Sequence, residues 1–213
     1  MRFHYGPLPE NPEFRPEAGG WHKLREPSVT VFTWIAGFVG FALFLATIWA
    51  WVGLAGVELN FSVSVRPGEE ASWAFASLVL QFLGGVALLI LVHELLHAAI
   101  YPNFGFDRRT FLGAWPSKGL FYAYFDGELS RNRFVVTLLT PFLVLTIGLL
   151  VFEVLVRTDS AWLPGWSILN AAFAGGDITA TLLVVVQVPS RAIVRNQGWQ
   201  TWWRTAGEAA GEL

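Results

Sequence analysis

The sequence predicts an all-α membrane protein with four transmembrane helices, a small β-hairpin in a cytoplasmic loop and a short extracytoplasmic strand. Two observations predict this fold class. Hydrophobic residues make up 54% of the 213 residues and charged residues only 14%, whereas a soluble domain carries about 25% charged residues. The apolar residues also form blocks long enough to cross the ~30 Å hydrocarbon core of a lipid bilayer.

Four apolar segments are long enough to span this core as helices, at ~1.5 Å per residue. The first contains no charged residue, and the third and fourth each contain one acid, Glu153 and Asp177. The second carries His93, Glu94 and His97 near its end. We expect the helices at residues 29–57, 73–101, 134–156 and 162–188. The membrane domain then covers residues 29–190, between an N-terminal arm (1–28) and a cytoplasmic or interfacial tail (191–213).

Basic residues are distributed unequally between the two sides of this arrangement. Of the 14 Lys and Arg residues, only Arg66 and Arg157 fall on the side opposite to the N-terminal arm. Cytoplasmic loops are enriched in Lys and Arg, so we expect a multi-pass protein of the cell membrane with both termini in the cytoplasm. The net charge of -2 gives no sign of a nucleic-acid partner, and the absence of cysteine excludes thiolate metal ligands.

Three extramembrane segments have recognisable patterns. Residues 58–66 alternate polar and apolar side chains, which predicts a short strand. Residues 110–115 and 120–125 are rich in aromatic residues and flank a turn at 116–119, which predicts a β-hairpin. The hairpin segment (109–125) either packs its aromatic side chains on lipid headgroups or offers an edge strand to an extended peptide substrate. Residues 199–204 combine tryptophans with an arginine, as is typical of headgroup depth.

The motif that carries chemistry is His93-Glu94-Leu95-Leu96-His97. Two histidines four residues apart lie on one face of a helix and can bind one zinc ion. Glu94 lies about 100° around the helix from His93, where it can reach water at the metal without being a third ligand. This is the H-E-x-x-H arrangement of zinc peptidases, in which zinc lowers the pKa of water and the glutamate acts as general base.

The membrane context makes this motif more specific than it is in a soluble protein. A charge in the middle of a bilayer costs about 2.5–3.5 kcal/mol on insertion scales, so ionisable groups within membrane helices are functional by default. Here three of them fall within five positions of a helix that is otherwise uncharged. The alternative is that the motif lies at the cytoplasmic interface, where its side chains are simply solvated.

A catalytic zinc ion needs a third protein ligand. The candidate is Asp177, which follows Gly175 and Gly176, two residues that allow close approach of another helix or a substrate backbone. Asn170 lies two helical turns earlier and could donate a hydrogen bond to a substrate oxyanion. In the alternative interpretation, both residues serve only packing or interhelical hydrogen bonding.

Other acids compete less well for the role of third ligand. Glu153 lies near the opposite side of the membrane from the two histidines. Asp126 and Glu128 lie in the cytoplasmic loop, so their depth in the membrane does not exclude them as the third ligand. Pro141 in the third helix is expected to bend that helix or to free a backbone carbonyl near the site.

These residues resemble two related groups of zinc enzymes. H-E-L-L-H at the end of a second membrane helix, with an Asp in a fourth, is similar to the intramembrane site-2 protease class. The chain more closely resembles the zincin peptidase family DUF3267 over residues 73–203. The matching features are the H-E-L-L-H motif, Thr140-Pro141, Asn170 with Gly176-Asp177-Ile178, and residues 192–199 of the tail.

The resemblance implies zinc ligands at His93, His97 and Asp177, with Glu94 as the general base. The site-2 class usually has an Asp-Gly pair and a proline-bearing Asn motif in its fourth helix. Here Ile178 follows Asp177, and no proline lies between Asn170 and Asp177. The sequence therefore predicts an integral membrane zinc metallopeptidase acting on a membrane-protein or peptide substrate. The alternatives are a zinc-dependent hydrolase of a lipid or other non-peptide amide, and a non-catalytic metal-binding scaffold.

Overall fold

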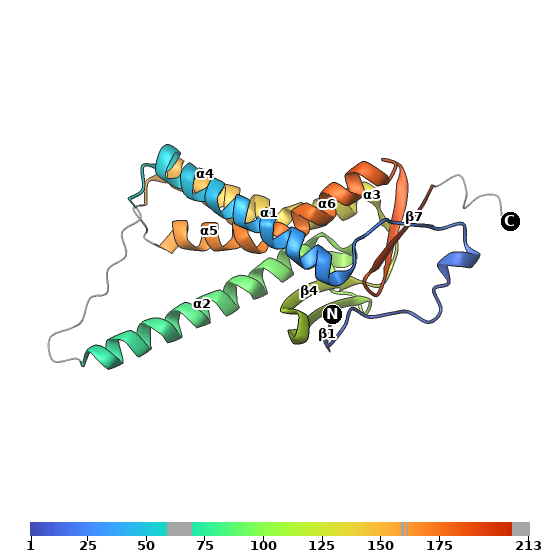
Figure 1. Ribbon diagram of the computed structural model, residues 1–213, viewed down its shortest axis with the longest axis horizontal. Coiled ribbons are helices and arrows are strands. Elements are labelled where there is room, and N and C mark those ends of the chain that lie inside the picture. The colour runs from blue at the N-terminus through green and yellow to red at the C-terminus, as the bar shows by residue number, and fades with distance from the viewer. Residues whose placement is uncertain (59–69, 159, 161, 206–213) are drawn as a thin grey trace.

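The computed structural model describes residues 1–58, 70–158, 160 and 162–205. Long helices occupy one end of the molecule, and two small sheets occupy the other end together with the N-terminal arm (Figure 1). The helical elements are α1 (Val29–Ala50), η2 (Trp51–Ala55), α2 (Ala71–Ile100), α3 (Arg131–Pro141), η5 (Phe142–Gly148), α4 (Leu149–Val156), α5 (Trp162–Phe173) and α6 (Gly175–Gln187). Short 3₁₀ turns lie at η1 (Pro16–Ala18), η3 (Pro102–Gly105) and η4 (Pro116–Lys118).

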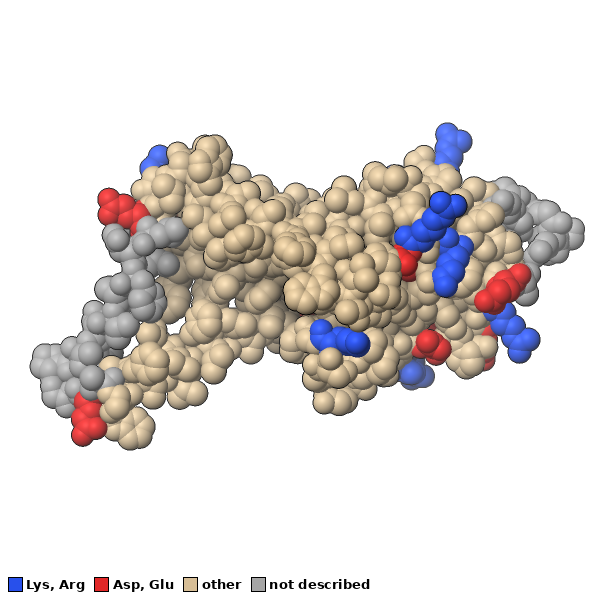
Figure 2. All heavy atoms as spheres, in the orientation of Figure 1, with Lys and Arg blue, Asp and Glu red and all other residues tan. Residues whose placement is uncertain are grey.

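Three helical segments are long and apolar enough to cross a membrane, namely Val29–Ala55, Ser72–Ile100 and Arg131–Val156. Their bounds agree closely with the first three predicted helices. On the face shown in Figure 2, a few charged side chains lie at the left end, most others lie over the half that holds the sheets, and the stretch between them is uncharged. Large apolar side chains such as Phe38 and Leu80 are more than 70% exposed, as is expected of surfaces that face lipid.

The fourth predicted helix is not continuous. Residues 162–188 form two helices, α5 and α6, which meet at Ala174 with a bend of 46°. The pair is a fourth span only if the bent helices cross the membrane together. The break comes directly before Gly175 and Gly176, since glycine has a low helix propensity and makes an irregular backbone less costly.

The bend lies where α1 crosses α5 and α6 at very close range. A Cβ atom on Gly175 would lie 2.2 Å from the carbonyl oxygen of Ala36, and one on Gly40 would lie 2.3 Å from that of Ala172. Only residues without a Cβ permit this backbone approach. The predicted close approach is therefore present at Gly175, and it fixes the start of α6 against α1.

Pro141 leaves the third span helical but changes its hydrogen bonding. Proline has no N–H group, so the carbonyl of Thr137, four residues earlier, loses its intrahelical partner. The helix continues after Pro141 as the π-helical segment η5 before α4 begins. The carbonyls released here are the ones that the site uses.

Two small sheets cap the helices. One has the order β1-β3-β4 and contains the predicted hairpin at the predicted residues, Thr110–Trp115 and Leu120–Phe125. The other has the order β2-β7-β6-β5 and includes an antiparallel hairpin formed by the C-terminal tail. The remaining strands are β1 (Arg2–Tyr5), β2 (His22–Lys23), β5 (Leu129–Ser130), β6 (Ala192–Gln197) and β7 (Gln200–Thr205).

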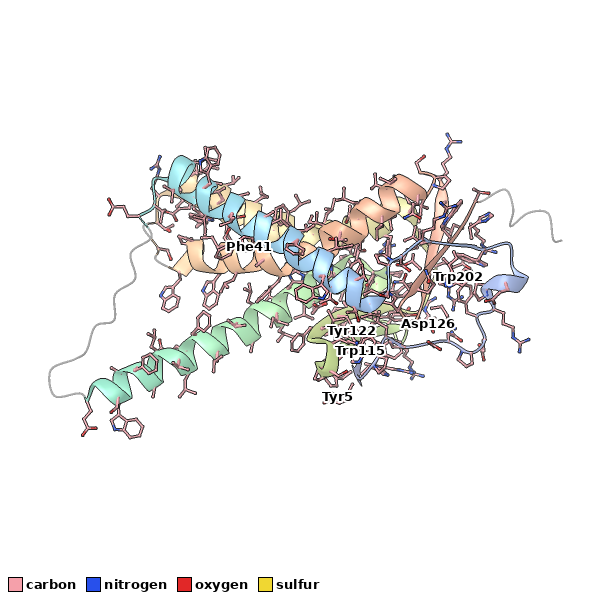
Figure 3. The ribbon with its side chains drawn as sticks, viewed as in Figure 1. Tyr5, Phe41, Trp115, Tyr122, Asp126 and Trp202 are labelled. Carbon is pink, nitrogen blue, oxygen red and sulfur yellow. The ribbon has the colours of Figure 1, made fainter. Side chains whose placement is uncertain are left out.

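The tail forms two paired strands, which were not predicted from the sequence. Strand β6 pairs with β5 directly before α3, and β7 pairs with β2 of the N-terminal arm. Val194 of β6 and Leu24 of the arm are almost completely buried in one core with Val184 of α6. Figure 3 shows Tyr122, Asp126 and Trp202 together at this end, away from Phe41 on α1. The strand predicted at 58–66 lies outside the described residues.

Candidate metal centre

Three side chains converge between α2 and α6. His93 and His97 are one turn apart on α2, with ring centroids separated by 5.0 Å. Each of these residues and Asp177 offers a ligand atom, and the three atoms lie within 4.8 Å of one another. The Nε2 atom of His93 is 3.0 Å from one carboxylate oxygen of Asp177, and that of His97 is 3.4 Å from the other. The structure thus brings together the three residues expected to hold a metal.

The competing acids have other partners. Asp126 accepts hydrogen bonds from Asn11 and Arg195, and Glu128 pairs with Arg204. Glu153 is buried near the end of α4, where it accepts a hydrogen bond from Thr158. Within the part of the chain that the structure describes, none of these three carboxylates joins the histidine pair.

His97 is oriented by the carbonyl that Pro141 releases. Its Nδ1 atom lies 2.8 Å from the backbone oxygen of Thr137, and a carbonyl can only accept, so Nδ1 carries the hydrogen. This fixes the tautomer whose Nε2 lone pair faces Asp177. Such an outer hydrogen bond on the second ring nitrogen is the usual partner of a metal-binding histidine.

His93 is oriented in the same way by Asn170. Its Nδ1 atom lies 2.8 Å from Oδ1 of Asn170. The amide nitrogen of Asn170 donates to the carbonyl of Pro141 at 3.1 Å and to Oγ1 of Thr146 at 2.9 Å. Both amide hydrogens are therefore used inside the protein, and the residue is fully buried. These contacts match the expected interhelical role and leave no amide hydrogen for a substrate oxyanion.

The network continues away from the metal. Ser167 donates to the carbonyl of Thr146, and Nε1 of Trp51 donates to Oγ of Ser167 at 2.8 Å. It links α1–η2, α3–η5, α5 and α2 through buried polar groups, and a fully satisfied network of this kind holds its members in one arrangement. Sequence reasoning missed Thr137, Thr146, Ser167 and Trp51. The only available signal was the position of Pro141 four residues after Thr137.

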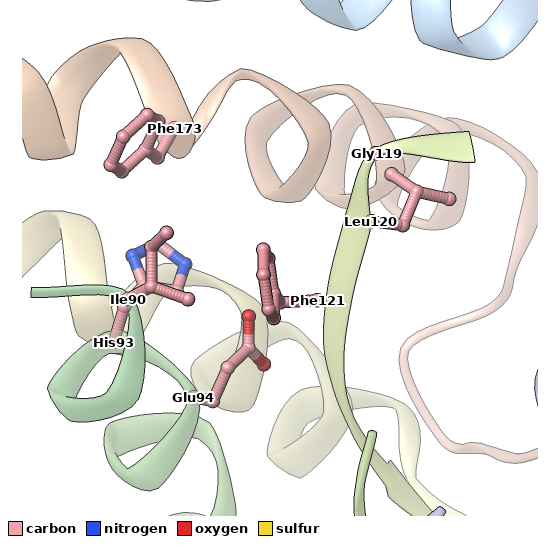
Figure 4. A pocket seen from close by; sticks show the side chains of 7 residues that line it. All are labelled: Ile90, His93, Glu94, Gly119, Leu120, Phe121 and Phe173. Carbon is pink, nitrogen blue, oxygen red and sulfur yellow. The ribbon is translucent and has the colours of Figure 1, made fainter. Parts of the chain in front are cut away.

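Glu94 faces a pocket beside the histidines. Its Oε2 atom is buried and has no hydrogen-bond partner in the part of the chain that the structure describes. The pocket is lined by Ile90 and His93 of α2, Phe121 of β4 and Phe173 of α5, and Figure 4 shows the Phe121 ring beside the Glu94 carboxylate. A larger cavity of about 250 Å³ connects Glu94, both histidines and Asp177 with Leu8 of the N-terminal arm.

These residues fit a zinc ion. Two imidazoles and one carboxylate form a donor set found in catalytic zinc sites, which keep a further position open. Both imidazoles present the correct nitrogen because Thr137 and Asn170 hold the other one. A buried carboxylate oxygen, Oε2 of Glu94, has no hydrogen-bond donor among the described residues and is available to a water at the metal.

Comparison with known proteins gives one match. A family model described as "Putative zincin peptidase", DUF3267, matches residues 86–193, about half of the chain. The matched region starts in α2 before the histidines and ends in β6, so it contains all the residues of the site. No curated protein and no solved structure matches the chain.

Proposed function

Because the chain belongs to the DUF3267 family of putative zincin peptidases, we propose that it is an integral membrane zinc metallopeptidase. It hydrolyses peptide bonds of a membrane-protein or peptide substrate within or next to the bilayer. In the proposed orientation both termini are cytoplasmic, because most Lys and Arg residues belong to the arm, the loop of the hairpin and the tail. The site then lies toward the cytoplasmic ends of the spans, where water can reach it.

One observation carries this proposal. Residues from two helices, 80 or more positions apart in sequence, present two imidazoles and a carboxylate to one point. Burying three ionisable groups together in an apolar helical domain is costly unless they act on something. The Glu94 carboxylate lies beside them, and its Oε2 atom has no hydrogen-bond partner among the described residues.

The protein residues divide the chemical work between them. His93, His97 and Asp177 hold the zinc ion, which when bound polarises a carbonyl and lowers the pKa of water. The Glu94 carboxylate accepts a proton from the attacking water and delivers it to the leaving amine as the C–N bond breaks. Asn170 and Thr137 contact the outer ring nitrogens of His93 and His97 and act as positioning residues for the two imidazoles.

The edge of β4 supports a peptide as the substrate. The N–H of Gly6 donates to the carbonyl of Ala114 at 2.9 Å, so the backbone polar groups of Ala114 face β1. Phe121, its partner on β4, therefore belongs to a non-hydrogen-bonded pair, and its own N–H and C=O face away from β3. Within the described residues only β3 pairs with β4.

The open part of this edge is at Phe121, because the Ala123 carbonyl already accepts a hydrogen bond from Tyr101, and it lies next to the proposed general base. Phe121 and Glu94 line the same pocket. An extended peptide that pairs with Phe121 would gain backbone hydrogen bonds in the way that peptides add to sheet edges. A helical substrate hides its carbonyls in internal hydrogen bonds, so holding a segment in extended form prepares it for attack. The other predicted role of the hairpin, packing of its aromatic side chains on lipid headgroups, stays an alternative, since Phe121 is also exposed.

Metal analysis and turnover together test the proposal. Purified protein should contain one zinc ion per chain, and Asp177→Ala should lose it. Glu94→Gln should keep the zinc and lose cleavage of a peptide substrate. Glu153→Gln is the matched control, because Glu153 is also a buried acid in a span but lies outside the metal group, and it should keep both zinc and turnover.

The same variants separate the remaining hypotheses. A metal-free active protein, or full zinc occupancy in Asp177→Ala, would remove the basis of the proposal. A zinc-loaded protein whose Glu94→Gln variant traps lipid rather than protein would indicate a lipid hydrolase. Zinc binding with no difference between the wild type and Glu94→Gln in any hydrolysis assay would indicate a scaffold.

A further inference from the structure

A second pocket lies at the C-terminal end of α6, outside the metal centre. It is lined by His22, Lys23, Arg25, Val186, Gln187 and Trp203. None of these residues lines the pockets around Glu94. The lining combines three basic side chains with an indole and an aliphatic residue, a composition that suits an anion attached to an apolar body.

The two cations of this pocket point outward because the residue between them points inward. Leu24 is only 2% exposed and belongs to the core between the sheets and α6. Lys23 and Arg25 flank it in extended chain and are both exposed. In the described structure neither forms an ion pair, and the Lys23 ammonium lies 5.9 Å from the Trp202 ring. The nearby acid, Glu26, accepts hydrogen bonds from Thr201 and Gln200; burial raises the pKa of its carboxyl, and the positive charge of Lys23 acts to lower it.

The cationic segment is fixed to the end of the helix. The backbone N–H of Arg25 donates to Oε1 of Gln187 at 3.0 Å, and Nε2 of Gln187 donates back to the carbonyl of Arg25 at 3.3 Å. Arg131 donates to the carbonyl of Val185 at 3.1 Å and adds a further positive charge at this end of α6. The positive charges are thus held beside the last helical turn, where the helix dipole also favours cations.

The adjoining surface of α6 is apolar. Val186 is 82% exposed and lines the pocket itself, and Leu182, one turn earlier, is 56% exposed. The pocket therefore lies at the level where an apolar helix surface meets a cationic rim. This is the depth of phospholipid headgroups at a membrane surface.

We propose that this pocket binds the headgroup of an anionic phospholipid. Lys23 and Arg25 contact the phosphate, the Trp203 indole lies at the level of the glycerol backbone, and one acyl chain runs along Leu182 and Val186. The cationic part of the pocket could bind the phosphate of a lipid headgroup or a free phosphate ion. The apolar surface continuous with the pocket selects a lipid over a free phosphate, and charge complementarity selects an anionic lipid over a zwitterionic one.

The test is native mass spectrometry of the full chain in detergent, titrated with dioleoyl phosphatidylglycerol or dioleoyl phosphatidylcholine. The double variant Lys23→Gln/Arg25→Gln should bind the first phosphatidylglycerol about 30-fold more weakly, from a roughly fivefold effect for each cation near an anionic surface. Its affinity for phosphatidylcholine should not change. The matched control is Arg2→Gln/Lys118→Gln, which removes the same charge from the β1-β3-β4 sheet and should keep the wild-type affinity for phosphatidylglycerol.

Two further measurements separate the lipid from other sources of phosphate. Val186→Gln, at an exposed position where no packing is lost, should weaken phosphatidylglycerol binding severalfold. Inorganic phosphate should not displace the lipid even at roughly 1,000-fold excess, which would be enough to saturate a site that binds free phosphate. Equal losses in the two double variants, no preference over phosphatidylcholine, or displacement by inorganic phosphate would each overturn the proposal. The outcome is independent of peptidase activity.

Discussion

The Nδ1 atom of His97 lies 2.8 Å from the backbone oxygen of Thr137, and that oxygen is available because residue 141 is a proline. An α-helical carbonyl normally accepts from the N–H four residues later. Pro141 has no such N–H, so the carbonyl of Thr137 stays free and orients a histidine on a different helix. The missing backbone N–H of one proline therefore determines the orientation of the His97 imidazole at the metal centre.

Replacing Pro141 with alanine should separate stability from metal affinity. The new N–H at position 141 would compete with His97 for the Thr137 carbonyl, so zinc affinity should fall about tenfold, the lower range for an outer hydrogen bond. The zinc-free protein should gain stability, because an interior proline strains a helix. Competition with a chromophoric chelator and thermal unfolding measure the two effects. Pro164→Ala, in the first turn of α5, should leave zinc affinity unchanged, and an unchanged affinity in Pro141→Ala would contradict the role of the proline.

Asn170 offers a second test of imidazole positioning. Asn170→Ala removes the acceptor for Nδ1 of His93, and zinc affinity should fall about 10- to 100-fold. Ser167→Ala is the matched control, since Ser167 is equally buried on α5 and belongs to the same network but touches neither histidine. Both variants should lower the unfolding temperature, because each leaves buried polar groups unpaired. If the two variants lose zinc affinity equally, Asn170 acts through packing alone.

Much of the site could be predicted because its strongest signals are local. His93 and His97 are four residues apart, so a helix alone brings them together. Asp177 is distant in sequence, yet it is the only acid in an apolar segment, and the cost of placing a carboxylate there indicates a role. Thr137 acts through its backbone, which every residue possesses, so the sequence marks it only indirectly, through the proline four residues later that frees a carbonyl. Asn170 was placed on the right helix, but its partners depend on how three helices pack.

The departures from the predicted fold have physical reasons as well. Hydropathy averaged over a whole span cannot locate a bend within it, so it does not show the break at Ala174, where α1 crosses α5 and α6 at close range. The aromatic residues of 199–204 suit both a bilayer interface and a strand. The strand is visible only in the pairing of β7 with the neighbouring β6 and with β2 of the N-terminal arm, where His22 lies opposite Trp203.

The two adjacent glycines at the bend should respond differently to alanine. Gly175→Ala places a Cβ atom 2.2 Å from the Ala36 carbonyl oxygen, so α6 or α1 must move and carry Asp177 with it. We expect a loss of about 1–3 kcal/mol in stability, typical of overpacking, together with weaker zinc binding. At Gly176 the nearest atom is a Phe32 ring carbon at 3.9 Å, and Gly176→Ala should be tolerated. Thermal unfolding and zinc titration check both, and equal effects would argue against the crossing as the constraint.

The N-terminal arm should show a pH dependence through Glu26. Burial raises the pKa of its carboxyl above the ordinary value of 4.5, although hydrogen bonds from Thr201 oppose this shift. The folded protein then holds the proton more tightly than the unfolded chain. This contribution to stability is complete below pH 4.5 and is lost as the pH rises through the raised pKa. Wild type should therefore lose unfolding temperature relative to Glu26→Gln over that window, whereas the exposed Glu13→Gln should follow wild type. A difference in unfolding temperature between wild type and Glu26→Gln that does not change with pH would contradict this role of Glu26.

The open edge of β4 can be tested by removing one hydrogen. Phe121→Pro deletes the N–H that faces away from β3 and leaves the hairpin ladder intact, which is the arrangement in which an edge strand tolerates proline. Gly119 is less suitable, because its φ of 63° is one that proline cannot adopt. If a substrate pairs with this edge, Phe121→Pro should lower kcat/KM for an extended peptide about fivefold to tenfold, the effect of about one hydrogen bond. Zinc content should stay normal. Phe121→Leu keeps the N–H while changing the ring, so it isolates the side chain. Equal activities of the proline and leucine variants would show that the substrate does not add to the sheet.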